Sequence, residues 1–379
     1  MSELLTRAQA KRLWLRALRL DRPDTFGAGP AATTAAVQHL GYVQIDTIHV
    51  IERSHHHILF TRIPRYKRAD LQQAQSKDKT VFEYWTHALS YVPTRDFRFF
   101  APAMKRSQKT PMSWFKTVKP ADLRKVLRLV KRQGALSIRD IDDDVLVEKD
   151  HPWASRKPPK RALQLAFFNG LLTVSERQGM LKAYDLTDRH FEWDQRPKPA
   201  SEPEVLAYLL ERALRAQAVV SVDSICHLDA KRKAGIKKLI ESKMRKKELV
   251  AVTIRGAENV QHWAQPELLA SAPRQEHDVT HLLSPFDPLV IMRKRVQLLF
   301  EYEHRFEAYL PKERRVFGYF ALPVLVDDDI VALVDLKTDR ERRQLLVQRW
   351  TWVKRGKSAA NKRRIEDELH RFERFQLDV

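Results

Sequence analysis

The 379-residue chain is poor in several features that mark common protein classes. It has one cysteine, Cys226, so no disulfide can form within the chain. No apolar run approaches the roughly 20 residues that a membrane-spanning helix needs, and the N-terminus lacks the apolar segment of a signal peptide. Acidic residues are also scarce, with 48 Asp and Glu against 69 Lys and Arg. These absences predict a cytoplasmic protein without a membrane partner.

The shortage of acidic residues leaves a formal net charge of +21 and a sequence pI of about 10.0. Such an excess indicates a polyanionic partner, and nucleic acid is the first candidate. An anionic membrane surface is the competing interpretation, but no long basic amphipathic stretch stands alone. The apolar content of 43% can build cores for two or three domains. We therefore predict a folded, nucleoid-associated DNA-binding protein.

One short stretch combines an amide and a carboxylate. Gln44 and Asp46 stand two residues apart in the run 41–48, which is rich in β-branched residues and predicts a strand. Side chains alternate between strand faces, so both polar groups should project from one side while Val43 and Ile45 enter the core. The carboxylate could activate a water held by the amide, or stabilise a developing cation. A polar pair on a wet strand face is the simpler alternative.

Helices that end in a glycine and lead into strands recur along the chain. In the first series, a helix at 31–40 ends at Gly41, directly before the Gln44 strand. The second and third series each combine three helices with a β-hairpin, which is the order of a winged helix-turn-helix. Their predicted elements are 122–131, a short helix capped by Ser137, 159–169 and the hairpin 171–186, then 201–217, a short helix from Ser221, 234–241 and the hairpin 249–264.

From His281 the sequence becomes β-rich, and a basic helix at 359–375 closes it. The polar segment 271–278 marks the break. We predict an α+β fold in which tandem winged helix-turn-helix modules precede a C-terminal β-rich, half-barrel-like domain with a terminal helix. The predicted C-terminal strands are 305–310, 316–326 and 330–336, with a hairpin tip at 327–329. The predicted domains are 1–116 with the catalytic strand, 117–198, 199–272 and 273–379.

Basic side chains gather at the start of the third helix in the second and third modules. From there Lys and Arg can reach phosphates while the helix enters the major groove. A solvated basic face without a partner is the alternative. The acidic run 140–144 should face away from DNA. The predicted DNA-binding residues are Arg53, His55, His56, Lys157, Lys160, Arg161, Lys231, Arg232, Lys233 and Lys237.

Three consecutive histidines, 55–57, raise the question of a metal ion. Neighbouring helical residues point about 100° apart, so three in a row cannot share one metal. Packing and phosphate contact are the other roles open to them. Cys226 and His227 have no C-x-x-C partner, which favours a core cysteine over a ligand or nucleophile. We predict no metal and no cofactor.

Two aromatic segments also have structural and functional interpretations. The segment Phe97–Phe100 is expected in the core rather than as a platform for stacked bases. Trp85 and His87 are expected to be core and support for the catalytic residues rather than catalysts themselves.

Separated segments, in the right order, resemble the signature of the bacterial winged-helix DNA glycosylases of the YcaQ and AlkZ type. Together they cover most of residues 5–340, and their order is specific where any one match would be weak. The resemblance implies tandem winged helices, a C-terminal β domain and excision of alkylated purines, including interstrand crosslinks. The segments are Gln-Ile-Asp-Thr at 44–47, Glu-Arg-Ser-His-His-His at 52–57, Phe-Thr-Arg at 60–62, Glu-Tyr-Trp-Thr-His-Ala at 83–88, Leu-Ser-Pro-Phe-Asp-Pro at 283–288 and Phe-Gly-Tyr-Phe-Ala-Leu-Pro at 317–323.

The resemblance places the family's catalytic pair on Gln44 and Asp46. Asp as the second member resembles the crosslink-repair branch, since the branch linked to antibiotic self-resistance has Gln there. An N7-alkylated purine is already cationic and leaves readily, so one carboxylate and one water suffice. Asp46 would stabilise oxocarbenium character and activate the water that Gln44 holds. The motif contains no lysine, which argues against a Schiff-base step, although lysines elsewhere leave that step open.

These observations predict a monofunctional DNA glycosylase that acts in base excision repair. It would hydrolyse the N-glycosidic bond of N7-alkylated purines and unhook crosslinks in double-stranded DNA, as a monomer and without base flipping. The alternative is a winged-helix transcription regulator without catalysis, which would need a dimer and a palindromic site. Asp46 separates the two hypotheses, because only the glycosylase needs it.

Overall fold

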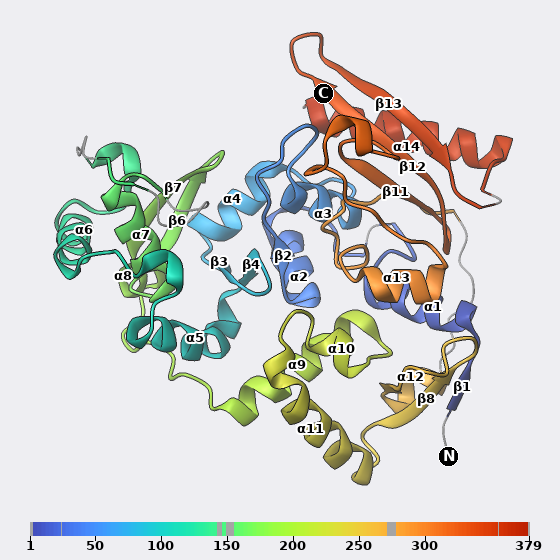
Figure 1. The fold of residues 1–379 in the computed structure, drawn as a ribbon, viewed down its shortest axis with the longest axis horizontal. Helices are drawn as coiled ribbons and strands as arrows, with labels where there is room; N and C mark the ends of the chain where they lie inside the picture. The colour runs from blue at the N-terminus through green and yellow to red at the C-terminus, as the bar shows by residue number, and fades with distance from the viewer. Residues whose placement is uncertain are drawn as a thin grey trace. The chain divides into compact units, whose positions relative to one another are not determined.

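The computed structural model describes residues 3–23, 25–141, 146–148, 155–270, 278–354 and 356–377. The chain forms two compact units (Figure 1): the larger unit comprises residues 1–67 and 206–379, and the smaller unit comprises 68–205. The domain boundaries at 116, 198 and 272 stay predictions. Most of the acidic run 140–144 and most of the predicted break 271–278 lie outside the described residues.

The N-terminal part of the larger unit shows why its helices begin and end where they do. Helix α1 (Arg7–Ala17) begins with a capping box, in which Thr6 Oγ1 accepts the Gln9 N–H and Gln9 Oε1 accepts the Thr6 N–H. Helix α2 (Gly29–Leu40) ends at Gly41, whose φ is +79°. A Cβ on Gly41 would lie 2.4 Å from Arg212 Cδ, so both conformation and space require glycine. The elements that follow are β2 (Val43–Gln44) and α3 (Ser54–Arg62).

The predicted strand around the Q-x-D stretch is therefore confirmed only at its start. Strand β2 ends at Gln44, so Asp46 lies two residues beyond it. Val43, Gln44 and Ile45 are all buried, which means that neither face of the strand is wet at these positions. The alternative of a polar pair on a wet strand face is therefore wrong for Gln44, because the surrounding core covers both sides of this short strand.

The smaller unit contains the helix and hairpin order predicted for the second series. The hairpin of β6 (Leu172–Gln178) and β7 (Leu181–Leu186) forms a sheet with β5 (Leu136–Ser137), in the order β5-β7-β6. Ser137 caps a 3₁₀ turn, Ile138–Asp140, rather than an α-helix. The remaining elements are α4 (Arg68–Ser76), the antiparallel pair β3 (Val81–Trp85) and β4 (Leu89–Pro93), α5 (Phe97–Lys109), α6 (Pro120–Gln133), α7 (Pro158–Phe168) and α8 (Thr187–Phe191), with 3₁₀ turns at Thr94–Asp96 and Ser113–Phe115.

Aromatic side chains form much of the core of the smaller unit. Phe97 and Phe100 are 1% and 8% exposed, and their rings lie 5.3 and 5.8 Å from that of Phe82. The core interpretation of these two residues is confirmed. Trp85 differs, since it is 38% exposed and touches Trp114 and Phe168 at its edge. Its predicted core position is wrong.

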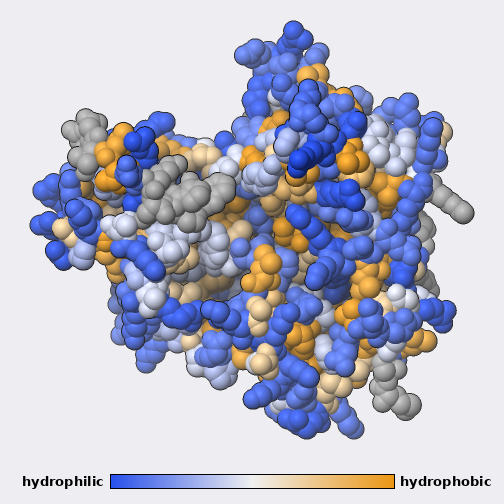
Figure 2. All heavy atoms as spheres, in the orientation of Figure 1, coloured by the Kyte–Doolittle hydropathy of each residue, from blue (hydrophilic) through white to orange (hydrophobic). Residues whose placement is uncertain are grey.

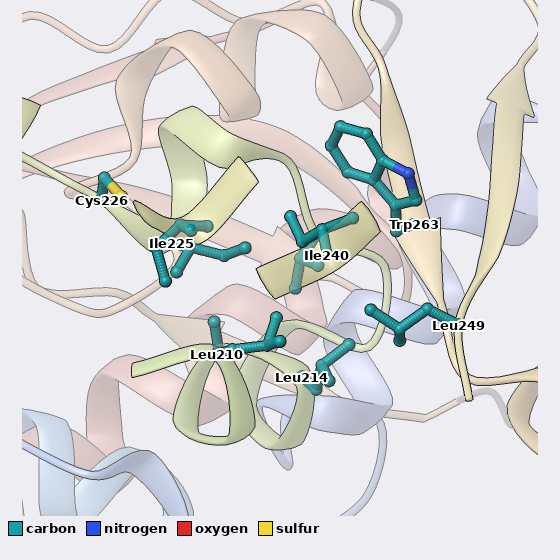
Figure 3. Packing of buried hydrophobic residues seen from close by; sticks show 10 residues of the cluster. Leu210, Leu214, Ile225, Cys226, Ile240, Leu249 and Trp263 are labelled. Carbon is teal, nitrogen blue, oxygen red and sulfur yellow. The ribbon is translucent and has the colours of Figure 1, made fainter. Parts of the chain in front are cut away.

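The third predicted series lies mainly in the larger unit, around one apolar cluster (Figure 3). Leu210 and Leu214 face Ile225, Ile240 and Trp263 there, and Cys226 is buried at the edge of the same group. Burial raises the pKa of Cys226 to about 11, so the thiol stays protonated and the core interpretation is confirmed. The elements are α9 (Glu202–Gln217), α10 (Val222–Ile225), a 3₁₀ turn at Ala230–Arg232, α11 (Lys233–Arg245), β8 (Val250–Ile254), β9 (His262–Ala264) and α12 (Pro266–Ala270).

A parallel pairing extends this third series in a way that the sequence did not suggest. Strand β1 (Glu3–Leu5) runs parallel to β8, with Glu3 opposite Val252. Because β9 pairs with β8 on its other side, the predicted hairpin becomes a three-stranded sheet, β1-β8-β9. Long-range parallel pairing leaves no local turn signal, so only the folded chain shows it.

The C-terminal part of the larger unit is a four-stranded antiparallel sheet in the order β10-β11-β12-β13, covered by the last helix (Figure 1). The strands β10 to β12 confirm a β-rich end with a tight turn near Asp327. The predicted strand at 305–310 is wrong, since that segment is irregular and pairs with no strand. The bounds are β10 (Thr280–Leu282), α13 (Arg293–Phe300), a 3₁₀ turn at Lys312–Arg314, β11 (Ala321–Val326), β12 (Asp329–Asp339), β13 (Gln344–Trp352) and α14 (Ala359–Leu377).

The surface matches the composition. Figure 2 shows mainly hydrophilic residues on the visible face, with apolar residues in small separate patches. No helix in the described ranges is long and apolar enough to cross a membrane.

Candidate active site

The candidate catalytic residues occupy the turn that follows β2. Gln44 is 6% exposed, and its carbonyl oxygen accepts a hydrogen bond from Ser54 Oγ at 2.9 Å. Asp46 is half-buried, and its Oδ1 accepts the N–H of Ile48 at 2.8 Å. Within the described residues, no Lys, Arg or His nitrogen lies within ion-pair distance of Asp46. The structure therefore holds this carboxylate by backbone alone.

The electrostatic environment of Asp46 follows from this arrangement. Burial raises the pKa of Asp46, and the N–H groups of Ile48 and Thr47 offset part of the rise. A carboxylate with a raised pKa is a better acceptor for a proton taken from water. Because no cation competes for it, Asp46 is free to interact with positive charge that develops on a substrate.

Hydrogen bonds from the C-terminal sheet fix the chain that follows the turn. The N–H of Thr338 in β12 donates to the Val50 carbonyl at 2.9 Å. In α3, Nε2 of His57 lies 2.8 Å from the Leu282 carbonyl in β10. Strands far along the sequence thus position the turn that carries Asp46.

The histidines of α3 are mostly interior residues. His57 is fully buried against the Phe372 ring, and burial lowers its pKa to about 4, so it is neutral at pH 7. His55 is 2% exposed, and its burial argues against the predicted phosphate contact. His56 is half-buried, with its Nδ1 2.7 Å from the Tyr66 hydroxyl. No group of three or more possible metal ligands occurs in the described parts of the chain.

A buried ion pair joins two of the segments that carried the family resemblance. The Arg62 guanidinium donates to both carboxylate oxygens of Asp287, at 2.7 and 3.1 Å, and both side chains are fully buried. Arg62 Nε also donates to the Leu18 carbonyl at 2.8 Å. The pair ties α3 to the loop before α13, so these two residues act in the fold rather than at the candidate site.

The segment 83–88 contains a second buried charge cluster, in the smaller unit. The Glu83 carboxylate is fully buried and pairs with Arg177 and Lys182. Burial would raise the pKa of Glu83, but the charges of Arg177 and Lys182, together with hydrogen bonds from Arg177 and Gln75, outweigh it and lower that pKa to about 2. Burial lowers the pKa of Lys182 to about 8, although Glu83 opposes the change. These contacts make Glu83 a structural residue of the smaller unit.

The segment 317–323 owes its shape to two carboxylates. Glu307 accepts the N–H groups of Val316, Phe317 and Gly318 at 3.1, 2.8 and 3.2 Å. Asp335 accepts the next two N–H groups, at 3.0 and 2.9 Å. Gly318 has φ +133°, and a Cβ there would lie 2.2 Å from Asp335 Oδ2, so the segment requires glycine.

The hydrogen bonds that Glu307 accepts also explain why 305–310 is not a strand. The same segment carries Tyr309, a residue that the sequence pattern did not indicate. Tyr309 is 72% exposed, and its ring contacts Phe306 at 5.7 Å. Partial burial raises the pKa of Tyr309, and the negative charge of Asp46 adds to the rise, so the phenol lies within electrostatic range of the candidate carboxylate. No local sequence signal could have found it, since more than 260 residues separate Tyr309 from Asp46.

The predicted DNA-binding residues of the smaller unit divide into two kinds. Lys157 and Lys160 are exposed at the start of α7. Arg161 is 5% exposed and donates to the Ser155 carbonyl, the Thr117 hydroxyl and the Glu148 carbonyl. Those bonds stabilise the unit, and they argue against the predicted phosphate contact by Arg161.

The predicted DNA-binding residues of the third series are mostly exposed. Lys231 and Lys237 are open to solvent, whereas Lys233 pairs with Asp223 at 2.6 Å and Arg232 with Asp229 at 2.8 Å. Exposed ion pairs contribute little and exchange easily for phosphate. Arg53, which precedes α3, is half-buried.

The chain is similar to the Streptomyces sahachiroi DNA glycosylase AlkZ, with a TM-score of 0.62 and 16% identity, over 99% of this chain and 97% of that one. At this identity the likeness shows a shared α+β fold. The model of the family described as DNA glycosylase AlkZ-like matches residues 37–375. The chain therefore belongs to the AlkZ-like DNA glycosylase family, a family of DNA repair enzymes, which confirms the resemblance at the level of the family.

Proposed function

We propose that this protein is a monofunctional DNA glycosylase that hydrolyses the N-glycosidic bond of N7-alkylated purines, with Asp46 and Gln44 as its catalytic residues. The observation that carries the proposal is the state of Asp46. It is half-buried, is held by backbone N–H groups and has no cation beside it in the described structure. A carboxylate needed only for stability would be expected to have a partner, as Asp287 does.

The proposed chemistry needs few groups. The N7-alkylated base carries a positive charge, so the bond to the sugar weakens without a strong acid. Asp46 stabilises the developing oxocarbenium ion and accepts a proton from the attacking water. Gln44 lies two residues away, and its amide holds that water in line with the sugar carbon.

The basic modules supply the affinity for DNA in this proposal. Lys157 and Lys160 in the smaller unit, and Lys231 and Lys237 in the larger unit, are exposed near helix starts, where winged helices contact phosphates. The protein then acts as a monomer on duplex DNA, in the cytoplasm at the nucleoid. A regulator without catalysis would not need the polarised, unpaired Asp46.

Crosslinked purines extend the proposal. A base joined to the opposite strand cannot rotate out of the duplex, so Asp46 must reach the sugar while the base stays stacked. Such access requires a site that is open to solvent, and the partial exposure of Asp46 supports one. An open site predicts similar excision rates for small and bulky N7 adducts.

The test is incubation with duplex DNA that contains N7-methylguanine, followed by alkaline cleavage of the abasic product. Wild-type protein should give strand breaks at the lesion, and the Asp46→Asn variant should give none. DNA binding without any breaks by the wild type would favour the regulator. A parallel time course with a nitrogen-mustard crosslink tests the open site, and complete refusal of that substrate would indicate a closed, base-flipping pocket.

A further inference from the structure

A pocket of about 510 Å³ lies between the start of α13 and the irregular segment after it, wholly within the larger unit. Its lining combines basic side chains with the apolar residues Phe306, Leu310 and Val316. The carboxylates in its wall are Glu303 and Glu307, and both already have partners. Glu303 pairs with Arg305 at 3.3 Å, and Glu307 accepts the three N–H groups described above. The pocket therefore keeps a surplus of positive charge.

Three cations of this wall have no acidic partner. Arg293, Lys294 and Arg314 are exposed, and none of them forms an ion pair in the described structure. Arg293 and Lys294 occupy the first turn of α13, which contains no acidic residue. Cations at a helix N-terminus oppose the helix dipole, so this placement is unfavourable unless an anion binds there.

A buried histidine supplies an independent sign of a ligand. His304 lines the pocket and is 4% exposed, and its Nε2 has no hydrogen-bond partner among the described residues. Its Nδ1 lies 3.1 Å from the buried Tyr302 hydroxyl, which has no other acceptor in the same ranges. We assign the phenol as the donor to Nδ1, since it then has an acceptor, and this assignment places the ring proton on Nε2. Burial, with Arg293 nearby, lowers the pKa of His304 to about 4, so the ring is neutral at pH 7 and offers one N–H donor.

We infer that this pocket is a phosphate-binding subsite, in which Arg293, Lys294 and Arg314 neutralise the anion and His304 donates a hydrogen bond to it. The inference rests on the proposed function in one respect, since the phosphate is assigned to the DNA strand that carries the target nucleotide. The segment Arg305–Leu310 forms one wall and also carries Tyr309, whose phenol senses the charge of Asp46. The pocket and Tyr309 therefore share the segment 305–310.

The experiment measures binding and involves no bond cleavage, so a protein that fails to excise still gives a result. The full-length wild type is titrated against labelled duplexes that contain a tetrahydrofuran abasic analogue. In each duplex one phosphate near the analogue is replaced by a neutral methylphosphonate. At one position, the methylphosphonate should weaken binding to the wild type about tenfold, as expected for the loss of one charge-assisted phosphate contact. In Arg293→Gln and Arg314→Gln the same replacement should change affinity less than about twofold, because the contact is already absent.

Lys337→Gln is the matched control, since Lys337 is exposed on β12 and does not line the pocket. It should keep the full sensitivity to the neutral linkage. His304→Phe should reduce that sensitivity in part, and melting temperatures check that each variant is folded. The DNA assignment is overturned if no linkage matters to the wild type, or if the variants keep its sensitivity. A second arm adds inorganic phosphate or a deoxynucleoside monophosphate, and stabilisation of the wild type without any linkage effect would show a free phosphate compound as the occupant instead.

Discussion

Two aspartates of the larger unit have opposite surroundings. Asp287 is fully buried, and both of its oxygens accept hydrogen bonds from Arg62. Asp46 is half-buried, and its carboxylate accepts hydrogen bonds only from backbone N–H groups in the described structure. Both lie in segments that resemble the same family signature, so the sequence pattern does not separate them. The difference shows that an aspartate contributes to stability where a cation neutralises its charge. Where no cation pairs with it, the charge is available for chemistry.

The largest expected effect is on excision by Asp46→Asn. The substitution keeps the shape and removes the charge, so single-turnover excision of N7-methylguanine should fall by roughly 10³-fold or more. Duplex affinity measured by anisotropy should stay within a few-fold. Asp194→Asn, at an exposed position, is the control and should be fully active. Retained activity in Asp46→Asn would contradict the catalytic assignment.

Asp287→Asn should instead act on the fold. It leaves the buried Arg62 guanidinium without a counter-charge, and urea denaturation should show a loss of roughly 3–5 kcal/mol in the free energy of unfolding. The double variant Arg62→Met, Asp287→Leu should recover much of that loss, because no buried charge remains. If Asp287→Asn were as stable as the wild type, the Arg62–Asp287 pair would not stabilise the contact between α3 and the loop before α13.

Gln44→Ala should have a smaller effect on excision than Asp46→Asn. It removes one hydrogen bond to the attacking water, which corresponds to a loss of roughly 10- to 100-fold in rate. Part of any loss could come from the space left in the core, so Ser54→Ala, which removes only the bond to the Gln44 carbonyl, is the comparison. A larger defect in Gln44→Ala than in Asp46→Asn would reverse the assigned roles.

The pH dependence should follow the raised pKa of Asp46. Excision needs the ionised form, so the rate should fall as pH drops through a pKa above the ordinary value of 3.8. Stability has the opposite sign, because a carboxyl group whose folded pKa is raised destabilises the fold as pH rises from 3.8 through the folded pKa. Asp46→Asn should therefore melt slightly above the wild type at pH 7, and this gain should disappear below about pH 3.8. If the wild-type excision rate stayed constant down to that pH, the ionised Asp46 carboxylate would not take part in the reaction.

Two neighbouring basic residues extend the comparison to DNA binding. Lys160 is exposed, so Lys160→Glu should reduce the slope of log affinity against log salt by about one. Arg161 is buried with three partners inside the protein, so Arg161→Gln should lower the melting temperature and leave the slope unchanged. If Lys160→Glu and Arg161→Gln changed the slope equally, Arg161 would have to contact DNA after all.

Local sequence patterns identified much of the helical structure. The glycine that ends α2 and the terminal helix both depend on short-range geometry, and each occurs where the sequence predicts it. The predicted strand at 305–310 failed because Glu307 binds backbone N–H groups from another segment. A local pattern cannot reveal a partner that lies nine residues or more away.

The basic character of the chain, its family and the candidate pair Gln44 and Asp46 all follow from the amino-acid order, because charge and motif order are properties of the chain alone. Which of the charged groups are available depends on the folded arrangement. It neutralised Asp287 with Arg62, buried His55 and Arg161, and left Asp46 without a cation in the described residues. It also brought Tyr309 within electrostatic range of Asp46 and formed the pocket around His304. The physical reason is that solvation and ion pairing depend on distances in space, which sequence separation does not set.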